Sequence, residues 1–136
     1  MAMKQKIIRL TSILLLAAAL LPVSSCRKGG INGDLDGQWR VITIENFVNG
    51  VTTEPQNIFY CFYLHTVNLT EPSVTAAGNM TYSGTTLTLE FPFNHDDVSL
   101  SRWGIYTSET TFKIEHLTSS HLIMASSWAR ITLRKF

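Results

Sequence analysis

The sequence predicts an all-β fold, an up-and-down antiparallel β-barrel of about eight strands that begins near residue 35. Three observations lead to this prediction. Apolar and polar residues alternate in short segments, for example in Leu87-Thr88-Leu89-Glu90, which is the pattern of a half-buried strand. Turn-forming pairs such as Asn49-Gly50 separate these segments. No segment after residue 34 keeps a helical period over the length that a helix needs.

Residues 1–25 are predicted to be a secretory signal peptide that is removed. They contain three cationic residues up to Arg9, the apolar run 10–21, and then Pro22-Val-Ser-Ser25. This order of a cationic, an apolar and a small-residue part is typical of such a signal. The alternative is a transmembrane anchor, which needs about 20 apolar residues. The run is shorter than that and ends at Pro22, so a signal peptide is favoured.

The segment Val23-Ser-Ser-Cys26 resembles the lipobox of bacterial lipoproteins. The resemblance implies that Cys26 becomes the first residue of the mature chain and carries palmitate-type acyl chains on its sulfur and its amine. Several acyl chains anchor a protein firmly, because each buried methylene contributes about 0.8 kcal/mol. The alternative is an ordinary signal followed by a cysteine that carries no lipid. We expect residues 26–34 to form a lipidated, flexible tether and residues 35–136 to form one barrel domain.

Arg27 and Lys28 follow the predicted lipidation site. In Gram-negative lipoproteins, an Asp at the position of Arg27 retains the protein at the inner membrane, so its absence favours the outer membrane. Surface-exposed lipoproteins of Bacteroidetes often carry an acidic tether, whereas residues 27–33 here are not acidic. We therefore expect a bacterial envelope protein on the periplasmic leaflet rather than on the cell surface.

The charge of the mature chain argues against nucleic acid as a partner. Removal of Lys4, Lys6 and Arg9 from eleven basic residues leaves eight against ten acidic ones, a net charge of −2. A nucleic-acid binder needs a concentrated basic face, which this composition lacks. Cys61 is the one thiol left after lipidation, so no intramolecular disulfide is expected. Its neighbours are apolar, which favours a buried, inert cysteine.

The predicted strands are short and rich in β-branched and aromatic residues. In chain order they are residues 38–45, 58–69, 80–83, 85–91, 103–106, 111–117, 121–126 and 130–136. A meander of this kind removes its exposed edges if it closes into a barrel. An eight-stranded barrel is just wide enough to be filled by side chains or to hold one small ligand. A β-sandwich is the alternative, because the number of strands fits both folds.

The first and last predicted strands together resemble the lipocalins. Gly37-Gln-Trp39 is similar to the Gly-x-Trp motif that opens their barrel, and Arg130 and Arg134 lie on the closing strand. The whole mature chain resembles the small lipocalin-like lipoproteins of Bacteroidetes. The resemblance implies that an arginine lies over the Trp39 indole and closes one end of the barrel. Such a cation–π contact contributes about 0.5–2 kcal/mol.

No constellation for catalysis or metal binding was found. His95-Asp-Asp97 is interpreted as a solvated turn, because adjacent side chains rarely converge on one ion. His116 and His121 flank a turn and could face one another across the hairpin, but two ligands do not make a zinc site. Nucleophile elbows and phosphate-binding glycine loops are absent from the sequence. The chain is therefore predicted not to be an enzyme and to need no metal or cofactor.

Two hypotheses for function remain open. The first is a binding module that holds a small apolar ligand inside the barrel. The second is a structural or interaction subunit without a cavity, which docks on another envelope protein or on a second copy. The inward residues of several strands either line the ligand or form a solid core: Leu87, Leu89, Phe112, Ile114, Ile131 and Leu133.

The segment 58–64 is apolar on both faces of its predicted strand, whereas a barrel strand needs one apolar face. Phe59 and Tyr63 lie on the second face. Either the loop 70–79 or the tether covers them, or they form an interaction surface for a partner or a second copy.

Overall fold

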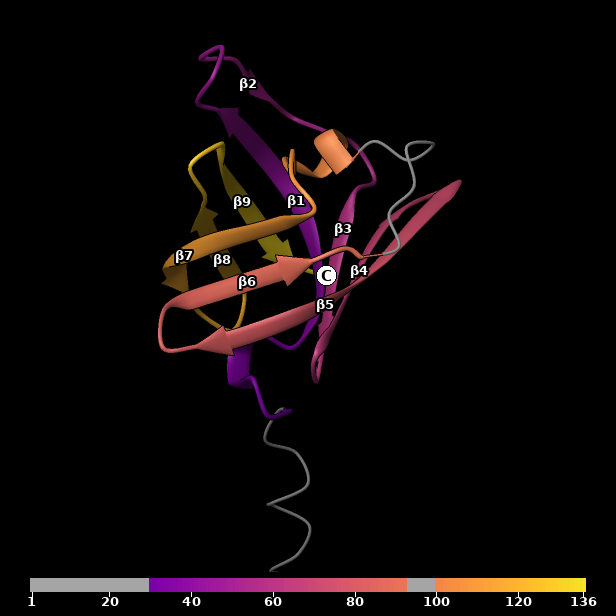
Figure 1. The fold of residues 1–136 in the computed structure, drawn as a ribbon, viewed down its shortest axis with the longest axis vertical. Coiled ribbons are helices and arrows are strands. Elements are labelled where there is room, and N and C mark those ends of the chain that lie inside the picture. The colour runs from indigo at the N-terminus through magenta and orange to yellow at the C-terminus, as the bar shows by residue number, and fades with distance from the viewer. Residues whose placement is uncertain (1–29, 93–99) are drawn as a thin grey trace, which may run out of the picture.

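The computed structural model describes residues 30–92 and 100–136, and these residues form a closed eight-stranded antiparallel barrel with one extra strand (Figure 1). The predicted signal peptide, the lipidation site Cys26 and the cluster at 95–97 lie outside the described residues. The strands are β1 (Gly37–Asn46), β2 (Thr52–Thr53), β3 (Phe59–Tyr63), β4 (Thr66–Glu71), β5 (Val74–Ser83), β6 (Thr86–Glu90), β7 (Glu109–Leu117), β8 (His121–Ala125) and β9 (Ala129–Lys135).

Closure is made by the pairing of β9 with β1, which runs from Trp39 opposite Lys135 to Asn46 opposite Ala129. The other neighbours follow the order of the chain, so the topology is a simple meander. The predicted all-β, up-and-down barrel is confirmed. The alternative of a β-sandwich is wrong, because one continuous sheet closes on itself and does not split into two layers.

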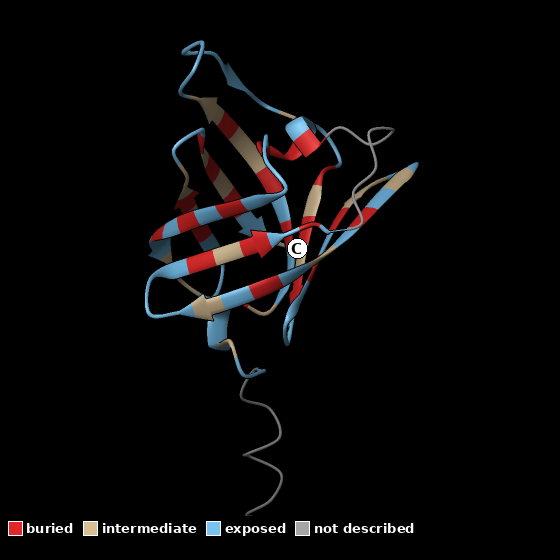
Figure 2. Cartoon of the chain, in the orientation of Figure 1, coloured by how far each residue is buried: buried red, intermediate tan, exposed pale blue. Residues whose placement is uncertain are grey.

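Alternation along the strands places the apolar side chains inside. In β6, Leu87 and Leu89 are buried, whereas Thr86 and Glu90 are exposed. Figure 2 shows the same alternation of buried and exposed residues around the barrel. The described residues include no helix that is long and apolar enough to cross a membrane.

Five of the predicted strands lie within two residues of β1, β6, β7, β8 and β9. The long predicted strand 58–69 is wrong, because the chain reverses within it and forms the β3–β4 hairpin. The turn is Leu64-His65, and Leu64 has a φ of +55°, in the left-handed region that a leucine seldom adopts. Thr66 Oγ1 donates to the Tyr63 carbonyl at 2.8 Å and helps to hold the turn. Because the turn contains neither glycine nor asparagine, the sequence does not mark it.

Two other segments also differ from the prediction. Residues 103–106 are not a strand: Trp103 ends the 3₁₀ helix η2 (Leu100–Trp103), and Gly104 turns the chain with a φ of +80°. Residues 70–79 are not a covering loop, because they form the β4–β5 hairpin, and β5 begins at Val74. The second apolar face of β3 is therefore not covered by this segment.

The extra strand β2 shares one edge of β1 with β3. Residues Gly37 to Arg40 of β1 pair with β3, whereas Ile44 and Glu45 pair with β2. Toward β9, a bulge lies between Val41 and Thr43. The extra residue shifts the alternation, so that Trp39 and Val41 point inward before it and Ile44 after it.

Gly78 in β5 makes room for an aromatic ring of the core. It lies among the inward positions of its strand, and the ring of Phe91 is buried beside it. A Cβ at Gly78 would come within 2.6 Å of both the Glu90 carbonyl oxygen and the Phe91 ring. Glycine is therefore required here for close packing and not for a turn.

We predict that Gly78→Ala lowers the free energy of unfolding by about 1–3 kcal/mol, because the new methyl group overpacks the core against Phe91. Urea unfolding followed by tryptophan fluorescence measures the change. Ala77→Ser, at the exposed neighbouring position, is the control and should change stability by less than about 0.5 kcal/mol. Equal stability of Gly78→Ala and the unmodified protein would contradict this account of the packing.

Candidate functional site

One end of the barrel is closed by Trp39, whose indole is completely buried. The short 3₁₀ helix η1 (Gly33–Leu35) lies beneath it, and Trp39 Nε1 donates to the Leu35 carbonyl at 2.8 Å. Lys135 Nζ lies 4.3 Å from the centroid of the indole ring. The same ammonium group donates to the backbone carbonyls of Asp34, at 3.0 Å, and of Asp36. A cation, an aromatic ring and a helix turn thus seal this end, which we call the tether end because the described chain begins there (Figure 1).

The cation over Trp39 is not an arginine, so that implication of the family resemblance is wrong. Ile131 and Leu133 point into the barrel, and Lys135 is the next residue on this face of β9. Arg130 and Arg134 lie on the opposite face because side chains alternate along a strand. Ile131 and Leu133 are apolar and two residues apart, so the alternation of the strand already places Lys135 on the same inward face. This sequence pattern could have identified Lys135.

Gly37 adopts a φ of +127°, and a Cβ there would lie 2.9 Å from Lys135 Nζ. The glycine of the Gly-x-Trp motif therefore provides both the backbone angle and the space for the cation. Burial lowers the pKa of Lys135, and the nearby carboxylates of Asp34 and Asp36 oppose this shift in part.

Arg130 has a different role on the outer surface. Its guanidinium binds Glu115 at 2.6 Å and Glu45 at 3.1 Å, and its central carbon lies 5.4 Å from the centroid of the Phe47 ring. The hydrogen bond from Arg130 lowers the pKa of Glu115. The three charged side chains join β1, β7 and β9 on the outside and fix the position of Phe47. Arg134 is exposed and lies opposite Arg40 across the closing pair of strands.

The six side chains predicted to line a ligand or to form a core all lie in the barrel interior. Leu87, Leu89, Phe112, Ile131 and Leu133 have no exposed surface, and Ile114 is 8% exposed. Because the first five side chains have no surface that a water molecule can reach, no water-sized void adjoins them. They pack with the other members of one core cluster.

The opposite end of the barrel, which we call the far end, is covered from within by Trp103. Tyr60 Oη donates to the Trp103 carbonyl, and burial raises the pKa of Tyr60 well above its usual value. Trp103 is itself fully buried, and its Nε1 has no hydrogen-bond partner. Such an orphaned donor is uncommon in a folded core. Sequence reasoning placed Trp103 in a strand and did not identify this position.

The large apolar side chains that are exposed among the described residues all lie at the two ends of the barrel. At the far end the turns after β1 and β8 and the segment after η2 meet. We call their five residues the far-end cluster: Phe47, Val48, Val51, Tyr106 and Trp128. At the tether end the exposed apolar residues are Ile31, Tyr63, Leu64 and Phe136.

The far-end cluster is held in place by several interactions. The Tyr106 and Trp128 rings have centroids 5.9 Å apart, and Asn46 Nδ2 donates to Tyr106 Oη at 2.6 Å. The Phe47 amide donates to the Trp128 carbonyl at 2.9 Å, which joins the two turns. The aromatic side chains are therefore exposed to solvent, although contacts within the chain hold them in position.

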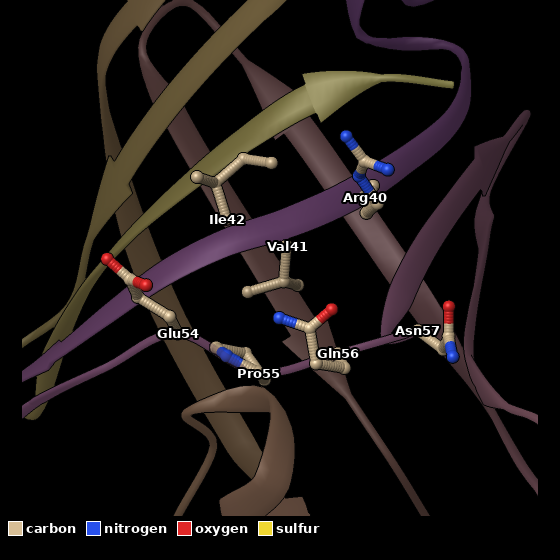
Figure 3. A pocket seen from close by; sticks show the side chains of 7 residues that line it. All are labelled: Arg40, Val41, Ile42, Glu54, Pro55, Gln56 and Asn57. Carbon is tan, nitrogen blue, oxygen red and sulfur yellow. The ribbon is translucent and has the colours of Figure 1, made fainter.

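An open hollow of about 310 Å³ lies outside the barrel, where the link between β2 and β3 leaves β1 (Figure 3). Val41 is its buried apolar floor, whereas Arg40 and Glu54 are exposed at its rim. It is lined by Arg40, Val41, Ile42, Glu54, Pro55, Gln56 and Asn57. No sequence motif marks this hollow.

The predicted interaction surface on β3 is only partly open. Phe59 is half-buried because the Phe136 ring packs on it edge to face, with centroids 5.1 Å apart. Tyr63 is 65% exposed. Cys61 between them is half-buried, and burial raises the pKa of its thiol. Phe136 thus covers part of this face.

The described residues contain no group of three potential metal ligands. His116 lies opposite Ile123 and His121 opposite Arg134, so the two histidines do not face one another. The expectation that they do is wrong, because the register of the β7–β8 hairpin pairs His116 with Ile123 and places Thr118, whose amide donates to the His121 carbonyl, beside His121.

Comparisons with known proteins agree with this fold. The model of a family described as a lipocalin-like domain matches residues 19–136. A lipocalin-like protein from Bacteroides uniformis ATCC 8492 superposes with a TM-score of 0.66 at 23% identity, over 76% of this chain and 100% of that chain. An uncharacterized protein from Bacteroides eggerthii DSM 20697 gives 0.58 at 19% identity, over 74% and 98%. No curated protein matches the chain significantly. These structural similarities concern the fold alone.

We predict that Lys135→Ala lowers the free energy of unfolding by about 1–2 kcal/mol, because it removes the cation from the Trp39 ring and from the backbone carbonyls of Asp34 and Asp36. Arg134→Ala, one residue earlier on the exposed face, is the control and should change stability by less than about 0.5 kcal/mol. Chemical unfolding at neutral pH measures both. A larger loss in Arg134→Ala than in Lys135→Ala would contradict the assignment of Lys135.

Proposed function

This chain belongs to the family of lipocalin-like domains, and from that premise we propose that it is a lipid-anchored envelope protein whose barrel is packed solid and binds a protein partner at its far end. The proposal has three parts: the anchor, the filled interior and the docking surface. Each depends on a different set of residues.

The proposed anchor depends on the lipobox-like segment Val23-Ser-Ser-Cys26 and on the position where the described chain begins. Gly30 lies at the tether end, so a lipid on Cys26 would hold the barrel by this end and leave the far end facing away from the membrane. Arg27 after the lipidated cysteine favours the outer membrane, and the lack of acidic residues in 27–33 favours its periplasmic leaflet.

The main support for an interaction role is the distribution of exposure. Interior side chains such as Leu89 and Phe112 have no exposed surface, which leaves no room for an apolar molecule beside them. A carrier of such molecules normally has a pocket of about 300–1,000 Å³ that buries most of the ligand. The large apolar side chains that are exposed lie instead at the ends.

The far-end cluster has the composition of an energetically dominant interface patch. Trp, Tyr and Arg are the residues most enriched at such positions. Tyr106, Trp128 and the nearby Arg130 are already fixed by contacts within the chain. Binding would therefore cost little side-chain entropy, because these groups are ordered beforehand. We propose a protein partner in the envelope as the occupant and binding, not catalysis, as the role of the domain.

A small apolar ligand in the barrel is the second candidate, and one observation favours it. Trp103 Nε1 is a buried donor without a partner, at the end of the barrel opposite to the Trp39 seal. A ligand with a carbonyl or carboxylate group could accept this hydrogen bond. Such a ligand would have to displace core side chains, and Met80 and Met124 are the most adaptable of these.

We predict that the fragment 27–136 remains free of bound small molecules in native mass spectrometry after incubation with an envelope lipid and metabolite extract. This fragment keeps the complete described core, which begins at Leu35. A stoichiometric adduct would overturn the filled barrel and support the second candidate. In that case Trp103→Phe should weaken binding of the small molecule. Trp128→Phe, at an exposed position of the far-end cluster, should leave this binding unchanged. A dimer without adduct would identify the partner as a second copy.

We predict that a photo-reactive amino acid at Val48 in the full chain cross-links to one protein partner in cells. Val48 belongs to the far-end cluster and is 72% exposed. The same probe at Thr81, on the exposed face of β5, is the control and should give no discrete product. Combining Tyr106→Ser with Trp128→Ser should abolish the Val48 product, because loss of dominant interface residues costs about 2 kcal/mol or more each. A product of equal yield from both positions would count against a specific docking surface.

A further inference from the structure

The tether end of the barrel carries an exposed apolar rim. Ile31, Tyr63 and Phe136 are 65%, 65% and 72% exposed, and Leu64 beside Tyr63 is also exposed. Tyr63 is the last residue of β3, and Leu64 is the first residue of the β3–β4 turn. Asn32 Nδ2 donates to the Leu64 carbonyl at 2.8 Å, so the beginning of the described chain is fixed against this turn. The rim and the entry point of the chain therefore lie together.

Chain length limits how far this rim can be from the proposed lipid on Cys26. Six residue steps separate Cys26 from Asn32, and each spans at most about 3.6 Å, so the two Cα atoms can be no more than about 22 Å apart. The far end is more distant, because the ten residues of β1 add about 33 Å. With the proposed lipid on Cys26, this limit keeps the tether end close to the membrane.

We propose that this rim lies in the membrane interface, so that Ile31, Tyr63 and Leu64 contact lipid and the barrel stands on the bilayer by its tether end. This inference rests on the proposed lipid anchor. Tyrosine suits such a position because its ring is apolar and its hydroxyl remains in the wet headgroup region. An apolar rim buried to this depth adds binding energy to that of the acyl chains.

The basic residues of the tether and of β9 would favour an anionic lipid surface, and the carboxylates of Asp34 and Asp36 at the same end of the barrel oppose them in part. Arg27 and Lys28 follow the proposed lipidated cysteine directly in the sequence. Arg134 is exposed on the outer face of β9, close to Phe136. Each basic side chain near an anionic surface contributes about 1 kcal/mol of attraction. Lys135 is not counted here because its ammonium group is engaged over Trp39.

A lipid surface explains the rim better than a protein partner does. An exposed cluster of apolar side chains on a soluble domain indicates an interaction site. At this end the membrane would be within reach of the tether at all times, whereas a protein would have to enter the gap between barrel and bilayer. The far-end cluster would lie away from the membrane, so a protein partner is proposed there.

The test uses the full chain, processed and acylated in cells, purified and reconstituted in vesicles of phosphatidylethanolamine and phosphatidylglycerol. A spin label is attached at Tyr63→Cys in a background of Cys61→Ser, and the matched control is Val48→Cys, whose side chain is similarly exposed at the far end. Collisions of each label with a water-soluble nickel chelate and with oxygen are measured by power saturation. The fragment 27–136, labelled at the same positions, serves as the soluble reference.

We expect the label at position 63 to collide with the nickel chelate several-fold less often than the label at 48 in vesicles, and more often with oxygen. In the soluble fragment both labels should be equally accessible to the chelate. Protection at 63 in the fragment as well would mean that protein covers the label, which overturns lipid contact.

The remaining outcomes separate the rim from the anchor. If the acylated chain floats with vesicles and both labels are equally accessible to water, the rim contact is wrong and the anchor stands. If mass spectrometry finds no acyl group on Cys26 and the chain does not float, both proposals fail. If dipolar coupling places two labels at position 63 close together, the rim pairs with a second copy and the lipid contact is overturned.

Discussion

The pairing of β9 with β1 is the interaction on which the other features of the molecule depend. It closes the sheet, so the first and last strands of the described meander cover each other's edges. It also sets which side chains face inward at the end of the chain. Because Trp39 lies opposite Lys135 in this register, the lysine reaches the indole and the carbonyls of η1. A shift by one residue would exchange it for Arg134 and would turn Ile131 and Leu133 outward.

Bulges modify the strict alternation at two places and create the features outside the barrel. The bulge in β1 moves the inward face from Val41 to Ile44. It also brings Glu45 to the outside, where Arg130 bridges it to Glu115. This ion network lies beneath Phe47, so an irregularity within one strand helps to position the far-end cluster.

The proposed filled interior leaves the two ends of the barrel as the proposed functional surfaces. The walls carry polar residues between the strands' buried positions, and the turns carry the exposed aromatic and aliphatic side chains. The two ends have different surroundings under the proposed anchor, since one is confined near the membrane and the other faces away from it. Membership of the lipocalin-like family therefore describes the scaffold, whereas the proposed roles depend on the residues of the turns.

The sequence by itself determined the all-β class, because the alternation in β6 to β9 and the turns between them are local properties that need no partner to be recognised. It favoured a barrel over a sandwich, and the pairing of β1 with β9 decided between them. It also identified Trp39 and the inward residues of the closing strands. The tertiary structure alone decided that the chain reverses at Leu64, since this turn lacks turn-forming residues and is held by the pairing of β3 with β4. The far-end cluster combines residues up to about eighty positions apart, such as Phe47 and Trp128, and sequence patterns do not encode such proximity. Closure of the barrel brings them together, because both lie in turns at the same end of neighbouring strands.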